Sequence, residues 1–220
     1  MRKLICLLVL AVVVAVGAGC AGKVTTEFVR PEEHPIMESK VYNYPYEKVW
    51  KAVVQSIGSS YFVLENIEKD SGILSLSFAA QNPGDFVDCG VVKEHGTVVM
   101  RAYDNTFAGT ASNIQRKFVT DQGVPGEMIR SCSLSGKANV LVQSLGPKQT
   151  RVTIRTRYVF TLTNMVMPYG APAPVKMEAT MNFTGSEVGT FPDTNKLQSL
   201  QCRSRGTLEI SILDGIEKGL

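Results

Sequence analysis

The chain has 220 residues, and its 23 Lys and Arg nearly balance its 20 Asp and Glu, for a formal net charge of +3. Two of these basic residues, Arg2 and Lys3, lie at the extreme N-terminus, so the remainder carries almost no net charge. This balance argues against a nucleic-acid partner, whose binding surface needs a concentration of Lys and Arg. The length is sufficient for one substantial core or two small ones.

The N-terminus has the layout of an export signal. Arg2 and Lys3 are followed by apolar residues 4–16, small residues 17–19 and Cys20. The apolar run is too short for a permanent transmembrane helix but is typical of a secretory signal. A cysteine at the cleavage point resembles the signal of bacterial lipoproteins, in which the cysteine is lipidated and becomes the first mature residue. The alternatives are an ordinary signal peptide with an incidental cysteine and a buried apolar helix.

A lipidated Cys20 implies a permanent membrane anchor, because each buried methylene contributes about 0.8 kcal/mol and several acyl chains are attached. Ala21 stands where an inner-membrane retention signal would have Asp. The resemblance therefore implies a protein that loses residues 1–19 and is held by lipid at the periplasmic face of the outer membrane. No other stretch is apolar enough for long enough to span a bilayer.

Export also decides how the remaining cysteines are interpreted. Cys6 is removed with the signal and Cys20 is blocked by lipid, which leaves Cys89, Cys132 and Cys202. Because the periplasm is oxidising, three cysteines predict one disulfide and one free thiol.

Residues 20–39 are polar, contain proline and lack hydrophobic periodicity, which is typical of a flexible tether. The pattern then becomes regular, and we expect a single domain over residues 40–220. Within it, "YPYEKVWKAVVQSIG" predicts a helix that begins at Pro45 and ends at Gly58. Its apolar side chains share one face at helical spacing; they are Trp50, Val53, Val54 and Ile57.

Alternation of apolar and polar residues predicts the strands, and a second helix closes the chain. We expect a short strand just before the first helix, at the start of "VYNYPYEKVW". Further strands are expected over 62–67, 73–79, 97–103, 137–145, 149–163 and 175–183, with "LGPKQ" joining 137–145 to 149–163. Residues 164–174 are expected to form a Pro-rich loop, and "SRGTLEISILDGIEKGL", residues 204–220, an amphipathic helix. This order predicts an α+β domain in which an antiparallel sheet grips a helix, in the sequence β-α-β-β, meander, α.

Two patches of the chain carry a family resemblance. "YPYEKVWKAVVQSI" and "FVLENIEKDSGILSLSF" resemble the opening helix and hairpin of helix-grip domains in bacterial envelope lipoproteins, such as the BamC-type accessory lipoprotein of the outer-membrane barrel-assembly machinery. "FVDCG" and "CRSRGTLEISIL" are similar to a pair of segments whose cysteines recur together in such lipoproteins. The likeness implies a Cys89–Cys202 disulfide and a free Cys132, while Cys89–Cys132 and Cys132–Cys202 stay open as alternatives.

The sequence contains no nucleophile, phosphate-loop or metalloprotease motif, and only two histidines, His34 and His95. The densest polar cluster, "DFVDCGVVKEH", matches no usual metal spacing, so we interpret it as a solvated loop. We therefore expect a non-enzymatic module without metal or cofactor that binds another envelope protein. The alternative function is that of a helix-grip carrier for a small apolar or lipid ligand.

Two groups of residues are candidate contact sites. The predicted loop offers Met165, Met167 and Tyr169 as a binding loop, unless these residues cap the end of the core. The strand before it offers a basic stripe to an acidic partner or anionic headgroups, unless it is an ordinary solvated face; the stripe consists of Arg151, Arg155 and Arg157.

Overall fold

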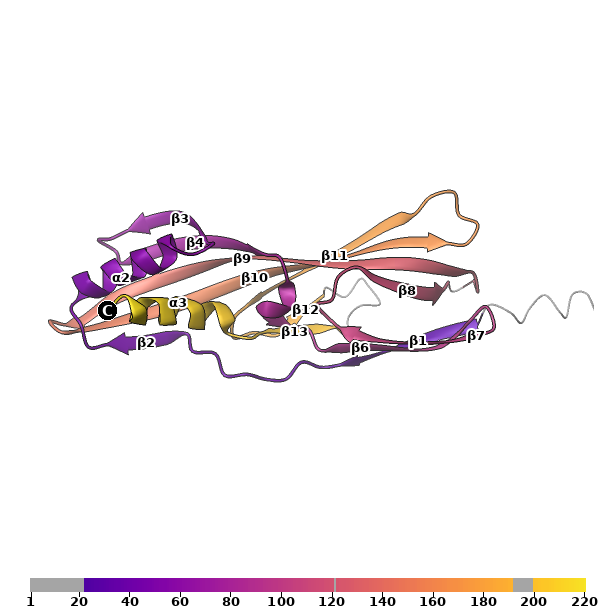
Figure 1. Ribbon diagram of the computed structural model, residues 1–220, viewed down its shortest axis with the longest axis horizontal. Coiled ribbons are helices and arrows are strands. Elements are labelled where there is room, and N and C mark those ends of the chain that lie inside the picture. Colours follow the sequence, from indigo (N-terminus) through magenta and orange to yellow (C-terminus); the bar gives the residue numbers. More distant parts are fainter. Residues whose placement is uncertain (1–21, 121, 192–199) are drawn as a thin grey trace, which may run out of the picture.

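The computed structural model describes residues 22–120, 122–191 and 200–220. It is an elongated molecule built along one long hairpin, formed by β9 (Pro125–Gly146) and β10 (Gln149–Pro168) (Figure 1). The two helices lie at the end of the molecule where this hairpin turns, whereas the described chain begins at the opposite end (Figure 1).

The long hairpin organises a central antiparallel sheet with strand order β11-β10-β9-β4-β3. Its other members are β3 (Val63–Glu68), β4 (Ile73–Ala80) and β11 (Val175–Thr184). Two further strands use the remaining edges, because β2 (Ser39–Tyr42) pairs with the start of β10 and β8 (Ile114–Val119) with the start of β9.

Two smaller sheets complete the molecule. One has the order β1-β6-β7, built from β1 (Gly22–Val29), β6 (Val91–Val98) and β7 (Arg101–Ala108). The other joins β12 (Gly189–Thr190), β13 (Gln201–Ser204) and β5 (Val87–Asp88), which follows the 3-10 helix η1 (Pro83–Asp85).

Both helices bury apolar faces against the long hairpin and against each other. Helix α2 (Tyr46–Gly58) and helix α3 (Thr207–Lys218) contribute Val53, Ile57, Ile212 and Ile216 to one continuous core. Gly215 allows the close approach, since a Cβ atom there would lie 2.1 Å from the Ser56 hydroxyl oxygen of α2. The core extends along even-numbered positions of β10, from Val152 to Leu162, because alternate side chains of a strand point to one face.

The predicted α+β helix-grip fold is wrong. Strands make up 57% and helices 15% of the described residues, arranged in several antiparallel sheets. The difference arises in the Gly-, Asn- and Thr-rich middle of the chain, where β5, β6, β7 and β8 form with little apolar alternation. Their strand character comes from hydrogen bonding to partner strands, which outweighs weak local propensity.

Two segment predictions are also corrected. Residues 20–39 are not wholly a flexible tether, because Gly22–Val29 form β1 and pair with β6 along their full length. The expected loop 164–174 is shorter, since β10 continues to Pro168 and β11 begins at Val175. The predicted helices at both ends of the domain are confirmed.

Candidate binding site

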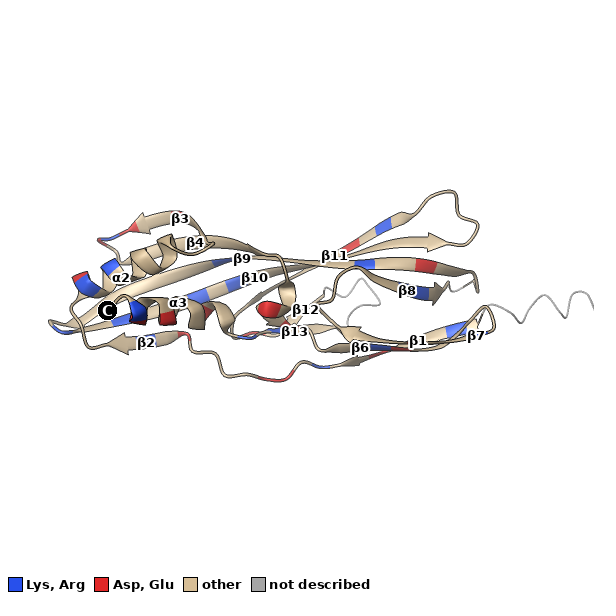
Figure 2. Ribbon diagram, viewed as in Figure 1, with Lys and Arg blue, Asp and Glu red and all other residues tan. Residues whose placement is uncertain are grey.

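A hollow lined by polar and charged side chains lies on the outer face of the central sheet, the face opposite the core. Odd-numbered residues of β10 point to this face, and Arg151, Arg155 and Arg157 are exposed there. The hairpin register places Lys137 of β9 beside Arg157 and Asn139 beside Arg155. Figure 2 shows the resulting concentration of basic residues on neighbouring stretches of β9 and β10.

The hollow has a volume of about 720 Å³, and its lining includes three cations and two carboxylates. These are Lys137, Arg155, Arg157, Glu38 and Glu65. A neighbouring hollow of about 700 Å³ shares Lys137 and Arg157 but has a more apolar lining that includes Tyr61, Val63 and Val159. The two hollows together offer an anion-binding centre with an apolar flank.

Hydrogen bonds favour the ionised form of two carboxylates, Glu65 in the lining of the hollow and Glu187 near Arg157. Lys137 Nζ lies 2.8 Å from Glu65 Oε2, and this bond, aided by the Ser77 hydroxyl, lowers the pKa of Glu65. The pKa of Glu187 is lowered chiefly by the Thr184 backbone N–H, which donates to Oε2 over 3.1 Å, and to a smaller extent by the charge of Arg157. Because Lys137 is paired with Glu65, the cations in the lining that would meet a ligand are the guanidinium groups of Arg155 and Arg157.

Glu209 of α3 lies beneath this region. A Cβ atom added to Gly185, which lines the hollow, would lie 3.1 Å from Glu209 Oε1. The Glu209 side chain is fully buried, and neither carboxyl oxygen has a hydrogen-bond partner among the described residues. Burial raises its pKa and Glu38 adds to the effect, while the facing Thr156 hydroxyl opposes it without forming a well-aligned hydrogen bond.

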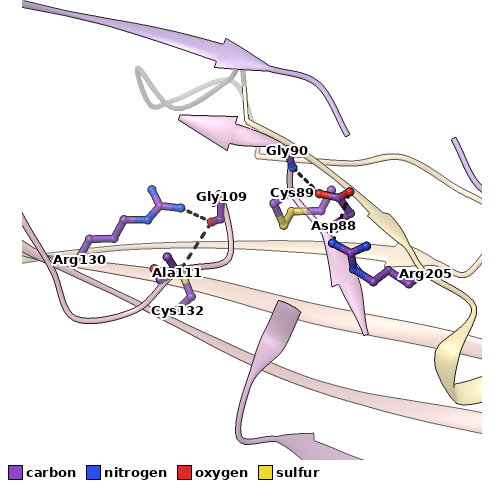
Figure 3. Close-up of a disulfide and its surroundings, with 9 residues drawn as sticks. Asp88, Cys89, Gly90, Gly109, Ala111, Arg130, Cys132 and Arg205 are labelled. Atoms are coloured by element: carbon purple, nitrogen blue, oxygen red, sulfur yellow. Dashed lines mark hydrogen bonds and ion pairs between the residues drawn. A yellow bond between two sulfur atoms is a disulfide. The ribbon is translucent and has the colours of Figure 1, made fainter. Parts of the chain in front are cut away.

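The predicted Cys89–Cys202 disulfide is present (Figure 3). It joins the residue after β5 to β13, with the two Cα atoms 4.0 Å apart and both residues buried. Arg205 reaches back to Asp88, with Nη2 3.5 Å from Oδ2, so an ion pair flanks the covalent link (Figure 3). The site is structural, because it fixes the strand before the last helix to the middle of the chain.

Cys132 is the free cysteine of the described residues. Its thiol donates to the Ala111 carbonyl oxygen over 3.4 Å, and Arg130 reaches the neighbouring Gly109 carbonyl (Figure 3). Burial raises the pKa of this thiol, and the nearby Arg130 charge only partly opposes that effect. A thiol with a raised pKa stays protonated at neutral pH and is a poor nucleophile.

The residues of the polar cluster "DFVDCGVVKEH" do not lie together, because some are buried in the protein and others are exposed to solvent. Glu94 is fully buried and receives hydrogen bonds from Arg116 and from the Tyr103 hydroxyl, whereas the exposed His95 pairs with Asp104. Strand alternation in β6 causes this separation. No group of three or more His, Cys, Asp or Glu in the described part of the chain could hold a metal ion.

The candidate loop residues lie elsewhere than expected. Met165 and Met167 belong to β10 and are partly exposed on its outer face, and Tyr169 follows the strand and donates its hydroxyl to Glu127 over 3.2 Å. They lie nearer the β10–β11 turn than the hollow does. Among the residues that line the hollow, the sequence analysis singled out Arg155 and Arg157 but not Lys137 and Glu65. Lys137 could have been found, because the predicted hairpin places residue 137 beside residue 157.

Cys20 lies outside the described residues. Within them, neither helix has the length and apolar character needed to cross a bilayer. No family model matches the chain, and no curated protein or solved structure matches it either.

Proposed function

We propose that the chain is an exported protein, anchored in the outer membrane by lipid on Cys20, that binds an acidic segment of another envelope protein without catalysis. The observation that carries the proposal is the outer-face hollow, where Arg155, Arg157 and Lys137 converge from paired strands. The anchor rests on the N-terminal sequence, in which Cys20 follows a short apolar run and small residues.

The chemistry of the lining favours an anionic ligand. A guanidinium group is planar, stays charged and donates paired hydrogen bonds to a carboxylate or phosphate. Rigid paired strands position both arginines, which reduces the entropy lost when a partner binds. The more apolar neighbouring hollow would accept side chains that flank the acidic group, and that combination suits a peptide segment better than an inorganic ion.

In-cell photo-crosslinking tests the partner. A crosslinking residue at Val159, which lines the more apolar hollow, should trap a discrete partner, whereas one at Ile210, exposed on α3, should not. The double variant Arg155→Ala, Arg157→Ala should lower the yield at least about tenfold, since each charged hydrogen bond contributes about 1.5–3 kcal/mol. Arg151→Ala is the matched control, because Arg151 lies on the same face outside the hollow.

An unchanged yield in the double variant would refute the role of the hollow. A crosslink to lipid in place of protein would favour the apolar-ligand alternative. The anchor is tested separately by Cys20→Ser, which should abolish fatty-acid labelling and move the protein from the detergent phase to the aqueous phase. If Cys20→Ser leaves both properties unchanged, the anchor assignment is wrong.

A further inference from the structure

We infer that the end of the molecule where β1 begins is a membrane-docking face, whose hairpin turns insert apolar side chains into the bilayer interface. The inference rests on the proposed lipid anchor and goes beyond it, because an anchor alone does not orient a protein. Three turns lie at this end, namely β6–β7, β8–β9 and β10–β11, while the C-terminal helix lies at the opposite end (Figure 1).

The β6–β7 turn carries the clearest signal. Val98 pairs with Arg101, so Val99 and Met100 form a two-residue hairpin turn, with φ of 49° and 62°. Such a turn normally contains Asn-Gly, because a left-handed backbone is strained for other residues and most of all for a β-branched one. Here two apolar residues occupy it and are 50% and 78% exposed. The turn therefore combines a strained backbone with exposed apolar side chains, as expected if these side chains contact a partner.

The other two turns add to the same apolar surface. Val124 precedes β9 and is exposed, and Tyr169 and Val175 flank the β10–β11 turn with exposed fractions of 48% and 58%. Gly126 pairs with Pro168 and Val119 with Pro125, which brings these two turns together. Exposed apolar side chains grouped at one end of a molecule mark a contact surface, and aromatic residues such as tyrosine suit the headgroup level of a membrane.

The position where β1 starts indicates that the docking face contacts a lipid bilayer. Gly22 pairs with Val98, immediately beside the Val99–Met100 turn. Cys20 is only two residues earlier, and two residues of extended chain span at most about 7 Å. Acyl chains on Cys20 therefore hold this turn at the membrane surface. A tether of some twenty residues would have left the orientation free, but pairing of Gly22–Val29 with β6 removes that freedom.

The charges around the turn are compatible with anionic headgroups. Lys23 pairs with Thr97, and Arg101 is the first residue of β7, so a basic side chain lies on each side of the Val99–Met100 turn. Figure 2 shows further basic residues on β8 and β11 near this end, together with acidic residues on β9 and β11; on β11, Lys176 pairs with Glu178 over 2.7 Å. Basic residues beside apolar tips favour an interface rich in anionic lipid.

Brominated-lipid quenching tests the inference. The lipidated protein is reconstituted into vesicles of phosphatidylethanolamine and phosphatidylglycerol with brominated acyl chains, and its tryptophan emission is measured. Met100→Trp and Tyr169→Trp place reporters in two of the turns, so that failure of one variant to fold leaves the other informative. Leu145→Trp is the matched control, since Leu145 is 45% exposed beside the β9–β10 turn at the opposite end.

Emission from positions 100 and 169 should fall by roughly half, because interfacial side chains come within reach of the acyl chains. Emission from position 145 and from native Trp50, on α2 at the far end, should stay unchanged (Figure 1). Protein that floats with the vesicles but shows no quenching at either turn would overturn the docking face and leave the anchor standing. Protein that fails to float would overturn the anchor and the docking face together.

Discussion

Glu209 is a buried carboxyl group whose ionisation opposes folding. Its pKa is raised above the usual 4.5, first by burial and then by the charge of Glu38. The folded state therefore holds this proton more tightly than the unfolded state does. The stability that Glu209 contributes is complete below pH 4.5 and is lost as the pH rises through the raised pKa.

We expect Glu209→Gln to raise the free energy of unfolding by about 1–2 kcal/mol at pH 7.5, because it removes a buried charge. At pH 4 the variant and the parent should have nearly equal stability. Urea titrations at both pH values measure the difference. Glu217→Gln is the control, since Glu217 is exposed on the same helix and pairs with Lys40; loss of stability in Glu209→Gln at pH 7.5 would contradict the assignment.

A second buried charge, Glu94, is fully paired. It accepts a hydrogen bond from Arg116 Nε over 2.7 Å and one from the Tyr103 hydroxyl over 3.0 Å. Arg116 and the buried Arg130 both lie over the Phe107 ring, 5.7 Å and 5.6 Å from its centroid. This network joins β6 to β8, and so links the β1-β6-β7 sheet to the central sheet.

Glu94→Ala should lower the free energy of unfolding by about 3–5 kcal/mol, because it leaves a poorly hydrated guanidinium without its partner. Glu47→Ala removes an exposed pair with Lys69 and should cost less than about 1 kcal/mol. Urea unfolding of the two variants gives the comparison. Equal losses of unfolding free energy in the two variants would show that the Glu94 network stabilises the fold no more than a surface ion pair does.

At the scale of elements, the disulfide secures the short strands β5 and β13. It links residues separated by 113 positions, and only two residue pairs hold β5 to β13. Strands this short are weakly stable alone, so the covalent link keeps them in register.

The double variant Cys89→Ala, Cys202→Ala should therefore lose about 4–5 kcal/mol of stability, on the chain-entropy model for a loop of this length. Cys132→Ala, which removes a free and partly buried thiol, should lose about 1 kcal/mol or less. Thermal unfolding under non-reducing conditions tests both. If the parent in reductant matches the oxidised parent in stability, the disulfide does not stabilise the fold.

Elements with strong local patterns were predicted well. Helices α2 and α3 and the β9–β10 hairpin carry apolar periodicity and clear turn residues, which depend on neighbours in the sequence. β1 was missed, and the single strand predicted over 97–103 is wrong, because residues 99–100 form the turn between β6 and β7. Most residues of β1 and β7 are exposed and carry no alternating apolar signal. What makes them strands is the partner strand, and that information is not local.

At the scale of the molecule, nearly all buried apolar side chains form one cluster that extends from α2 to β6 despite the elongated shape. We expect a single cooperative unfolding transition, since no part of the core is separable. Trp50 fluorescence, which reports on the helical end, and far-UV circular dichroism, which reports on all sheets, should give the same urea midpoint. Two separated midpoints would show that the β1-β6-β7 sheet opens independently.

The sequence by itself determined the properties that depend on composition and near neighbours: the helices, the long hairpin and the exposed position of Arg155 and Arg157. Tertiary structure decided the rest. Pairing with β6 turned a polar segment into β1, and the hairpin register brought Lys137 beside Arg157. The physical reason is that strand pairing satisfies backbone hydrogen bonds between residues far apart in the chain, and a local pattern does not specify those partners.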